Sequence, residues 1–253
     1  MNYTDVTVHD VSKLLELPET FVIDMRDEYS FIKGHLDGAH TASEENIKNL
    51  IKSRKHDIPL VVYCYHGNSS KELASFFTQV GFKQVYNLVG GWDAWDKYQQ
   101  AETQTIQLTL TAWLQKCGFD TRNLNSRIEN GMSPVMAAAL EGEFDILKML
   151  IQNNADLNLV NDDENNALWF ACFTEDLLII DLLIQHGINI DHQNVNGATS
   201  LIYAASAGKQ EVTKALINAG ADTNKMTLDG FTALDSAATL PILKLLRPLT
   251  TAA

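Results

Sequence analysis

Cys64 is the residue of this chain best placed for nucleophilic chemistry. An apolar run at 59–63 precedes it, and a small polar loop and an amphipathic stretch follow it. Gly67 and Asn68 let the backbone curl so that N–H groups point inward, and a helix start adds free N–H groups and a positive dipole end. Such a nest stabilises a thiolate and lowers its pKa. We therefore expect Cys64 to be the nucleophile, served by a loop of Tyr65, His66, Gly67, Asn68, Ser69 and Ser70.

The elements that must position Cys64 alternate between strand and helix. Apolar runs predict strands at 21–25, 59–63 and 84–88, and helical spacing predicts helices at 10–17, 28–33, 43–53, 70–80 and 91–98. This alternation predicts an α/β domain over residues 1–100, with a mostly parallel sheet flanked by helices. Chemistry in such sheets occurs beyond the carboxyl ends of the strands, which is where Cys64 falls.

Three segments of this domain resemble the motifs of rhodaneses, the thiosulfate sulfurtransferases. They are Ile-Asp-Met-Arg at 23–26 with the stretch 31–39, the loop at 62–70, and 85–95 with its Gly-Gly-x-x-x-Trp pattern. The resemblance covers nearly all of residues 5–98, and the loop is similar to that of small single-domain bacterial members. It implies that Cys64 takes the outer sulfur of thiosulfate, or of a related sulfane-sulfur donor, as a persulfide. The acceptor is then a thiol or dithiol protein, or cyanide in assays.

The loop itself agrees with such a step. It supplies N–H donors and two hydroxyls to a persulfide anion without needing a metal, and we expect neither metal nor cofactor. The competing interpretation is a phosphatase, whose loop follows Cys-x5-Arg. Here the sixth position after Cys64 is Ser70 and the nearest cation is Lys71, so the planar guanidinium that a phosphoryl group requires is missing from that position.

Other polar residues near the motifs have two interpretations each. Asp24 and Arg26 either support the loop or, as we favour, tie a strand end to neighbouring backbone. His66 lies either near substrate or in solvent. Lys71 either attracts thiosulfate or is a solvated charge at a helix start. His35 we expect to be a turn residue, and Trp92 and Trp95 to pack in the core and over the site.

Composition limits the partners and the compartment. The net charge is −13, and residues 101–253 carry nine Lys and Arg against 18 Asp and Glu, so we expect neither nucleic acid nor an anionic membrane as partner. No apolar stretch is long enough to span a membrane, and the N-terminus lacks signal-peptide features. Cys64, Cys117 and Cys172 are odd in number and scattered, which favours a reducing, cytoplasmic location.

The second part of the chain repeats with a period of 33 residues. Gly131, Glu164, Gly197 and Gly230 occupy equivalent positions, each 33 apart. This period and the sequences around it resemble ankyrin repeats, each a turn and two antiparallel helices. We expect an all-α ankyrin solenoid at 108–253, with a linker at 101–107 before it, full repeats at 131–163, 164–196 and 197–229, and partial caps at 108–130 and 230–253.

Two hypotheses for the whole chain remain. In the first, an active sulfurtransferase carries an ankyrin array that binds a protein partner and so selects or positions the sulfur acceptor. In the second, the chain is a protein-binding scaffold in which the rhodanese-like domain is a regulatory or accessory module. The intact loop around Cys64 favours the first.

Overall fold

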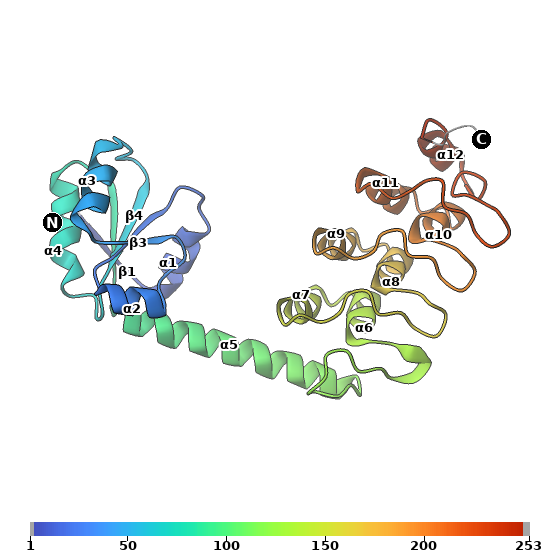
Figure 1. The fold of residues 1–253 in the computed structure, drawn as a ribbon, viewed down its shortest axis with the longest axis horizontal. Helices are drawn as coiled ribbons and strands as arrows, with labels where there is room; N and C mark the ends of the chain where they lie inside the picture. The colour runs from blue at the N-terminus through green and yellow to red at the C-terminus, as the bar shows by residue number, and fades with distance from the viewer. Residues whose placement is uncertain (1–2, 250–253) are drawn as a thin grey trace. The chain divides into compact units, whose positions relative to one another are not determined.

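The computed structural model describes residues 3–249, which divide into two compact units between Thr105 and Ile106 (Figure 1). The first unit is an α/β domain and the second is a stack of helices. The division falls inside one helix, α5 (Gly91–Lys116). The segment 101–107, which we expected as a linker, is therefore helical.

The first unit is built on a five-stranded parallel sheet with the order β1-β5-β4-β2-β3. Its strands are β1 (Thr4–Val6), β2 (Phe21–Asp24), β3 (Ala39–Thr41), β4 (Pro59–Tyr63) and β5 (Gln84–Leu88). The three apolar runs of the sequence form β2, β4 and β5. The edge strands β1 and β3 have three residues each and were not predicted. The strand that leads to Cys64 thus lies in the middle of the sheet.

Both faces of β4 are buried, as a central parallel strand requires. Leu60 and Val62 face the helices α3 (Glu44–Lys52) and α4 (Ser70–Gln79), which contribute Leu50, Ala74 and Phe77 to one core. Val61 and Tyr63 face the other core, which includes Val11 of α1 (Val8–Leu15) and Trp95 of α5, with Phe31 of α2 (Glu28–Lys33) packed against it. The strand end next to Cys64 is therefore held from both sides.

The second unit repeats the same local structure every 33 residues. Ser133, Asn166 and Thr199 each cap the first helix of a repeat, because the side-chain oxygen accepts a hydrogen bond from the backbone N–H three residues on. The first helices are α6 (Pro134–Glu141), α8 (Ala167–Thr174) and α10 (Ser200–Ser206). The second helices are α7 (Phe144–Gln152), α9 (Leu177–Gln185) and α11 (Gln210–Asn218).

A second set of equivalent side chains joins neighbouring repeats. Asn125, Asn158 and Asp191 each accept a hydrogen bond from the backbone N–H 31 residues later, at 2.9, 2.8 and 2.8 Å. These bonds satisfy loop N–H groups and hold each repeat in register with the next. Small residues at the first helices, such as Ala138, Ala171 and Ala204, are fully buried in the shared core.

The two ends of the stack are irregular, as expected of terminal repeats. The N-terminal end consists of the last part of α5, a loop and the short 3-10 helix η1 (Glu129–Gly131), with Trp113 and Phe119 in the core. At the C-terminal end a full repeat would have two helices. Within the described residues only α12 (Leu240–Leu246) forms there. Thr232 and Asp235 bond to each other as at a helix start, but the chain continues as a turn.

The buried face of α9 gives a test of this architecture. Leu183 is fully buried, whereas Leu178 of the same helix is 70% exposed. We expect Leu183→Ala to lower the free energy of unfolding of the repeat array by about 2–5 kcal/mol, and Leu178→Ala by less than about 1 kcal/mol. Urea unfolding followed by circular dichroism measures both. Equal losses in the two variants would contradict this packing.

Candidate active site

Cys64 directly follows β4 and is a free cysteine, 6% exposed, at the carboxyl edge of the sheet. The hydroxyl oxygen of Ser70, the first residue of α4, lies 3.3 Å from its sulfur. The turn from the strand to the helix therefore encloses the thiol, as the sequence predicted for this loop.

Two effects oppose each other at the Cys64 sulfur. Burial raises the pKa of the thiol, because it disfavours the anion. Hydrogen bonds from the Ser70 hydroxyl and from the backbone N–H groups of Ser70, His66 and Gly67 lower it, and together they are the larger effect. The pKa of Cys64 is therefore below its ordinary value, which raises the fraction of reactive thiolate.

The loop is held in shape by the first turn of α5. The carbonyl of Cys64 accepts a hydrogen bond from Trp92 N–H at 2.8 Å, and that of Tyr65 accepts one from Asp93 N–H at 3.1 Å. Gly91 has a φ of +54°, and a Cβ there would overlap the Cys64 carbonyl oxygen. Gly67, with a φ of +74°, approaches the same turn. We call these contacts the loop clasp, and Gly67 and Gly91 permit them because neither has a Cβ.

Arg26, which pairs with Asp24, contacts the clasp through the ring of Trp92. Their side chains form a buried ion pair at 2.6 Å, and the Arg26 guanidinium also donates to the Gly34 carbonyl at 2.5 Å. The same guanidinium lies 4.0 Å from the centre of the Trp92 ring. The pair thus ties the end of β2 to neighbouring backbone and also packs against the turn that holds the loop.

The side chains of the loop point to different partners. His66 Nδ1 lies 2.9 Å from Asp93 Oδ2, and the His66 side chain is 70% exposed. The Tyr65 hydroxyl bonds to Asp27 and to Ser30, and the bonds that Asp27 accepts from Tyr65 and from Ser30 lower its pKa to about 2. Lys71 is exposed 3.8 Å from Asp5. Asn68 and Ser69 are exposed, so the groups near the sulfur come from residues 66, 67 and 70.

Asn87 of β5 is a polar residue of the site that the sequence prediction missed. It is fully buried and accepts a hydrogen bond from Ser70 Oγ at 2.6 Å. An amide between the apolar residues of a predicted strand was the available signal, because asparagine is disfavoured in strands. His35, in contrast, bonds to the Phe31 carbonyl and stacks on the Phe31 ring, as a turn residue does.

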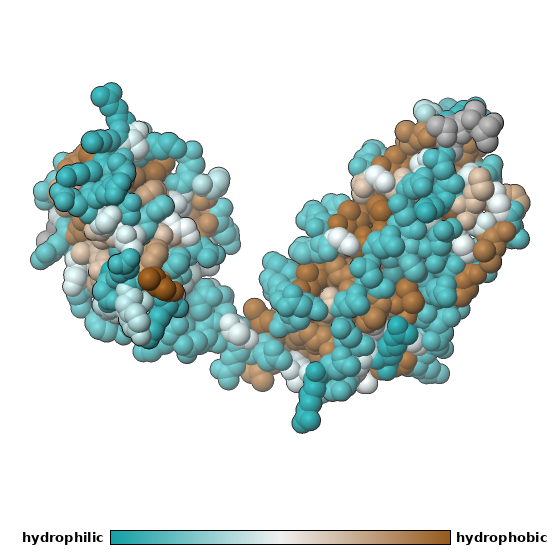
Figure 2. All heavy atoms as spheres, in the orientation of Figure 1, coloured by the Kyte–Doolittle hydropathy of each residue, from teal (hydrophilic) through white to brown (hydrophobic). Residues whose placement is uncertain are grey.

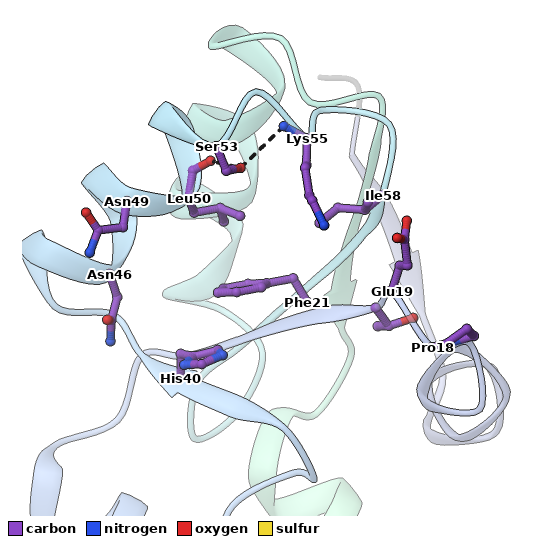
Figure 3. A pocket seen from close by; sticks show the side chains of 11 residues that line it. Pro18, Glu19, Phe21, His40, Asn46, Asn49, Leu50, Ser53, Lys55 and Ile58 are labelled. Carbon is purple, nitrogen blue, oxygen red and sulfur yellow. Dashed lines mark hydrogen bonds between the residues drawn. The ribbon is translucent and has the colours of Figure 1, made fainter.

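Cavities lie at both edges of the sheet. One of about 550 Å³ is bordered by Phe21 and His40, whose rings stack at 4.5 Å, and by Ile58 (Figure 3). Phe21 begins β2 and Ile58 precedes β4, so this cavity is at the amino edge, opposite Cys64. A second cavity of about 380 Å³, lined in part by Arg26 and Ser43, lies at the carboxyl edge, where β2 and β3 end. The second is therefore on the same edge of the sheet as the Cys64 sulfur.

The pKa values of the other two cysteines are raised, whereas that of Cys64 is lowered. Burial raises the pKa of Cys172 to about 12, and burial and the nearby charge of Glu141 raise that of Cys117. Among residues 3–249, no three His, Cys, Asp or Glu side chains are arranged to hold a metal ion. In the same part of the chain, every helix is too short or too polar to cross a membrane.

Comparison with known proteins matches both parts of the chain. A family model for the rhodanese-like domain matches residues 7–98, and a model for ankyrin repeats in three copies matches residues 101–194 and 174–250. These matches confirm the resemblances that the motifs and the period of 33 residues indicated.

Individual relatives match the first unit. The thiosulfate sulfurtransferase GlpE of Shewanella oneidensis is 38% identical over 94 residues, which are 37% of this chain and 93% of that protein. The protein of the same name from Pseudomonas aeruginosa strain PAO1 is 42% identical over 84 residues, 33% of this chain and 76% of its own length. That of Pseudoalteromonas translucida is 32% identical over 96 residues, covering 38% and 91%.

The contrast between cysteines predicts different reactivities within one sample. The pKa of Cys64 is lowered and that of Cys117 is raised, so Cys64 should react with iodoacetamide at a lower pH. Peptide mass spectrometry of the full chain, alkylated briefly between pH 6 and pH 10, measures both midpoints. A midpoint for Cys64 equal to or above that of Cys117 would refute the lowered pKa.

The clasp predicts that two glycines respond differently to the same change. Gly91→Ala places a methyl group against the Cys64 carbonyl, whereas Gly38→Ala, with a φ of +70°, meets no atom within 4 Å. Both variants bear the cost of a positive φ, about 1 kcal/mol. Only Gly91→Ala should displace the loop, so we expect it alone to slow alkylation of Cys64 by about tenfold or more at pH 7. Similar rates in both variants would argue against the clasp.

Proposed function

We propose that this chain, which belongs to the rhodanese-like family through residues 7–98 and to the ankyrin-repeat proteins through residues 101–250, is a sulfurtransferase. Thiosulfate, or a related sulfane-sulfur compound, is the donor, and a thiol or dithiol protein is the acceptor. The observation that carries the proposal is the Cys64 sulfur at the carboxyl edge of the sheet, with its pKa lowered by the N–H and O–H donors of its own loop.

The first half-reaction loads the enzyme. The Cys64 thiolate attacks the outer sulfur of thiosulfate, the sulfur–sulfur bond of thiosulfate breaks, and sulfite leaves with the electron pair. Cys64 then carries a persulfide anion. The backbone N–H groups of His66, Gly67 and Ser70, which already lower the pKa of the thiol, are positioned near this negative charge.

The second half-reaction returns the thiolate. An acceptor thiolate, or cyanide in an assay, attacks the outer sulfur, and the bond between that sulfur and Cys64 breaks. The products are the acceptor persulfide or thiocyanate and the free Cys64 thiolate. Electrons and atoms balance without an added oxidant or reductant, and the fit between the loop and the anion supports a reaction that needs no metal.

In this proposal the charged side chains near the loop attract the donor or stabilise the loop. Lys71 is exposed beside Asp5 and favours the approach of an anionic donor. Arg26, paired with Asp24, packs on Trp92 in the first turn of α5, which forms the clasp. In this proposal the two side chains therefore support the loop and do not contact the substrate. A phosphatase reaction is disfavoured, because Ser70 and not an arginine stands at the sixth position after Cys64.

The repeat array serves, in our proposal, to bind a protein partner. Figure 2 shows apolar residues at its surface among hydrophilic ones, and Phe173, Leu228 and Phe231 are all more than half exposed. Residues 101–253 carry twice as many acidic as basic side chains, so a partner with a basic face fits them better than a nucleic acid. The partner is the acceptor itself or a protein that presents it.

A scaffold function is the second candidate. The repeats make up the larger part of the chain, which favours a protein whose main activity is binding, with the rhodanese-like domain as a regulatory or accessory module. The reactive state of Cys64 favours the enzyme. A cytoplasmic location suits either function, because a reducing compartment keeps Cys64 as a thiol.

Turnover of thiosulfate and cyanide by the full chain separates the two candidates. We expect Cys64→Ser to lose turnover by on the order of a thousandfold or more, because it removes the nucleophile. Cys117→Ser is the matched control and should retain it. Turnover that persists in Cys64→Ser would show that Cys64 is not the nucleophile. A folded wild-type chain without turnover would support the scaffold.

A further inference from the structure

Asn87 is a fully buried side chain without a role in the two half-reactions described above. It lies in β5 between Tyr86 and Leu88, and its backbone is paired with Asp5 of β1 and Val62 of β4. A buried amide is costly unless its donors and acceptor are satisfied. The hydrogen-bond partners of the Asn87 side chain therefore indicate its role.

The partners fix which way the Asn87 amide points. On one side lie the Asp5 carboxylate at 2.6 Å and the Gly67 carbonyl at 3.2 Å. Both are acceptors only, so this side must be the NH₂ group. The carbonyl oxygen of the amide therefore faces Ser70 Oγ, 2.6 Å away. An amide oxygen can only accept, and so the Ser70 hydroxyl must donate to Asn87.

The Ser70 hydroxyl has one proton and two acceptors that compete for it. Its oxygen is 2.6 Å from Asn87 Oδ1 and 3.3 Å from Cys64 Sγ. While Cys64 is a thiol, its S–H can donate to the Ser70 oxygen and Ser70 can donate to Asn87, so every group is satisfied. When Cys64 is a thiolate, the hydroxyl can donate to the sulfur only by rotating toward it, which leaves the buried Asn87 oxygen without its donor.

We propose that Asn87 is a positioning residue that holds the Ser70 proton away from the Cys64 sulfur until the thiol ionises, and so opposes formation of the thiolate. The proposal deepens the proposed function, since it concerns the nucleophile of that reaction. The thiol proton leaves to solvent, and the Ser70 proton moves by rotation about the Cβ–Oγ bond. The S–H bond of Cys64 breaks as its proton passes to water, its electron pair stays on the sulfur, and no bond between heavy atoms forms or breaks.

Such opposition has a chemical use. The loop donors increase the amount of thiolate, but a thiolate that is stabilised too strongly is a weaker nucleophile toward sulfur. A competing acceptor for one donor limits that stabilisation. Asn87 thereby limits how far the loop donors lower the pKa of Cys64.

The charged groups around the site stay in place in this scheme. They are the His66–Asp93 pair on the loop and α5, the Lys71–Asp5 pair on α4 and β1, and the buried Asp24–Arg26 pair at the end of β2. Among the residues in these pairs, Asp5 is the one that bonds to the Asn87 side chain. The test must therefore separate an effect through Ser70 from an effect through Asp5 or Gly67.

A double-mutant cycle on the full chain makes this separation. The variants are Asn87→Val, Ser70→Ala and the two combined, and the readout is the pH midpoint of Cys64 alkylation, measured by peptide mass spectrometry. Asn87→Val removes the competing acceptor, so it should increase the acid ionisation constant by about twofold to tenfold, the worth of one hydrogen bond. Ser70→Ala should move the midpoint to higher pH. In the Ser70→Ala background, Asn87→Val should have no effect.

Two results would overturn the proposal. One is a shift by Asn87→Val that persists in the Ser70→Ala background, which would assign the effect to Asp5 or to the loop backbone. The other is a shift to higher pH. If the valine variant does not fold, Asn87→Leu, which is close to asparagine in shape, takes its place in the cycle. Alkylation needs no sulfur transfer, so a failed turnover assay would reject the proposed function and leave this cycle unaffected.

Discussion

The structure around the candidate site depends on the backbone clasp between the Cys64 loop and the first turn of α5. The two N–H groups of Trp92 and Asp93 satisfy the carbonyls of Cys64 and Tyr65, and the paired glycines allow the two backbones to approach. With these carbonyls held outward, the N–H groups of the loop are free to face the sulfur. The pKa of Cys64 is thus lowered by the Ser70 hydroxyl and by backbone N–H groups of its own loop.

The parts of the fold that the sequence could predict are those with a local signal. The apolar runs of β2, β4 and β5 predicted strands, and the polar loop after β4 predicted the enclosure of Cys64. The strands β1 and β3 have no such signal, because each has three residues and exists through its pairing with a neighbour. Asn87 was missed for the same reason. Its partners Ser70 and Asp5 are 17 and 82 residues away.

The repeat array was predicted by its period. Within it, too, features with a local sequence signal could be predicted and the others could not. The capping residues recur every 33 positions, so a local rule repeated three times sufficed. The polar segment 101–107 suggested a linker, but it contains neither Gly nor Pro and continues the helix α5. At the C-terminal end, residues 231–239 form no first helix. The bonds between Thr232 and Asp235 show that a capping pattern alone does not propagate a helix.

Cys64 is proposed as a nucleophile toward sulfane sulfur, and observing its persulfide tests this claim without relying on turnover. The full chain is incubated with thiosulfate, separated from it and analysed by peptide mass spectrometry, before and after addition of cyanide. We expect the mass of one added sulfur atom on the peptide with Cys64, none on the peptides with Cys117 or Cys172, and its loss after cyanide. No added sulfur on Cys64, or equal addition to Cys117, would contradict the claim.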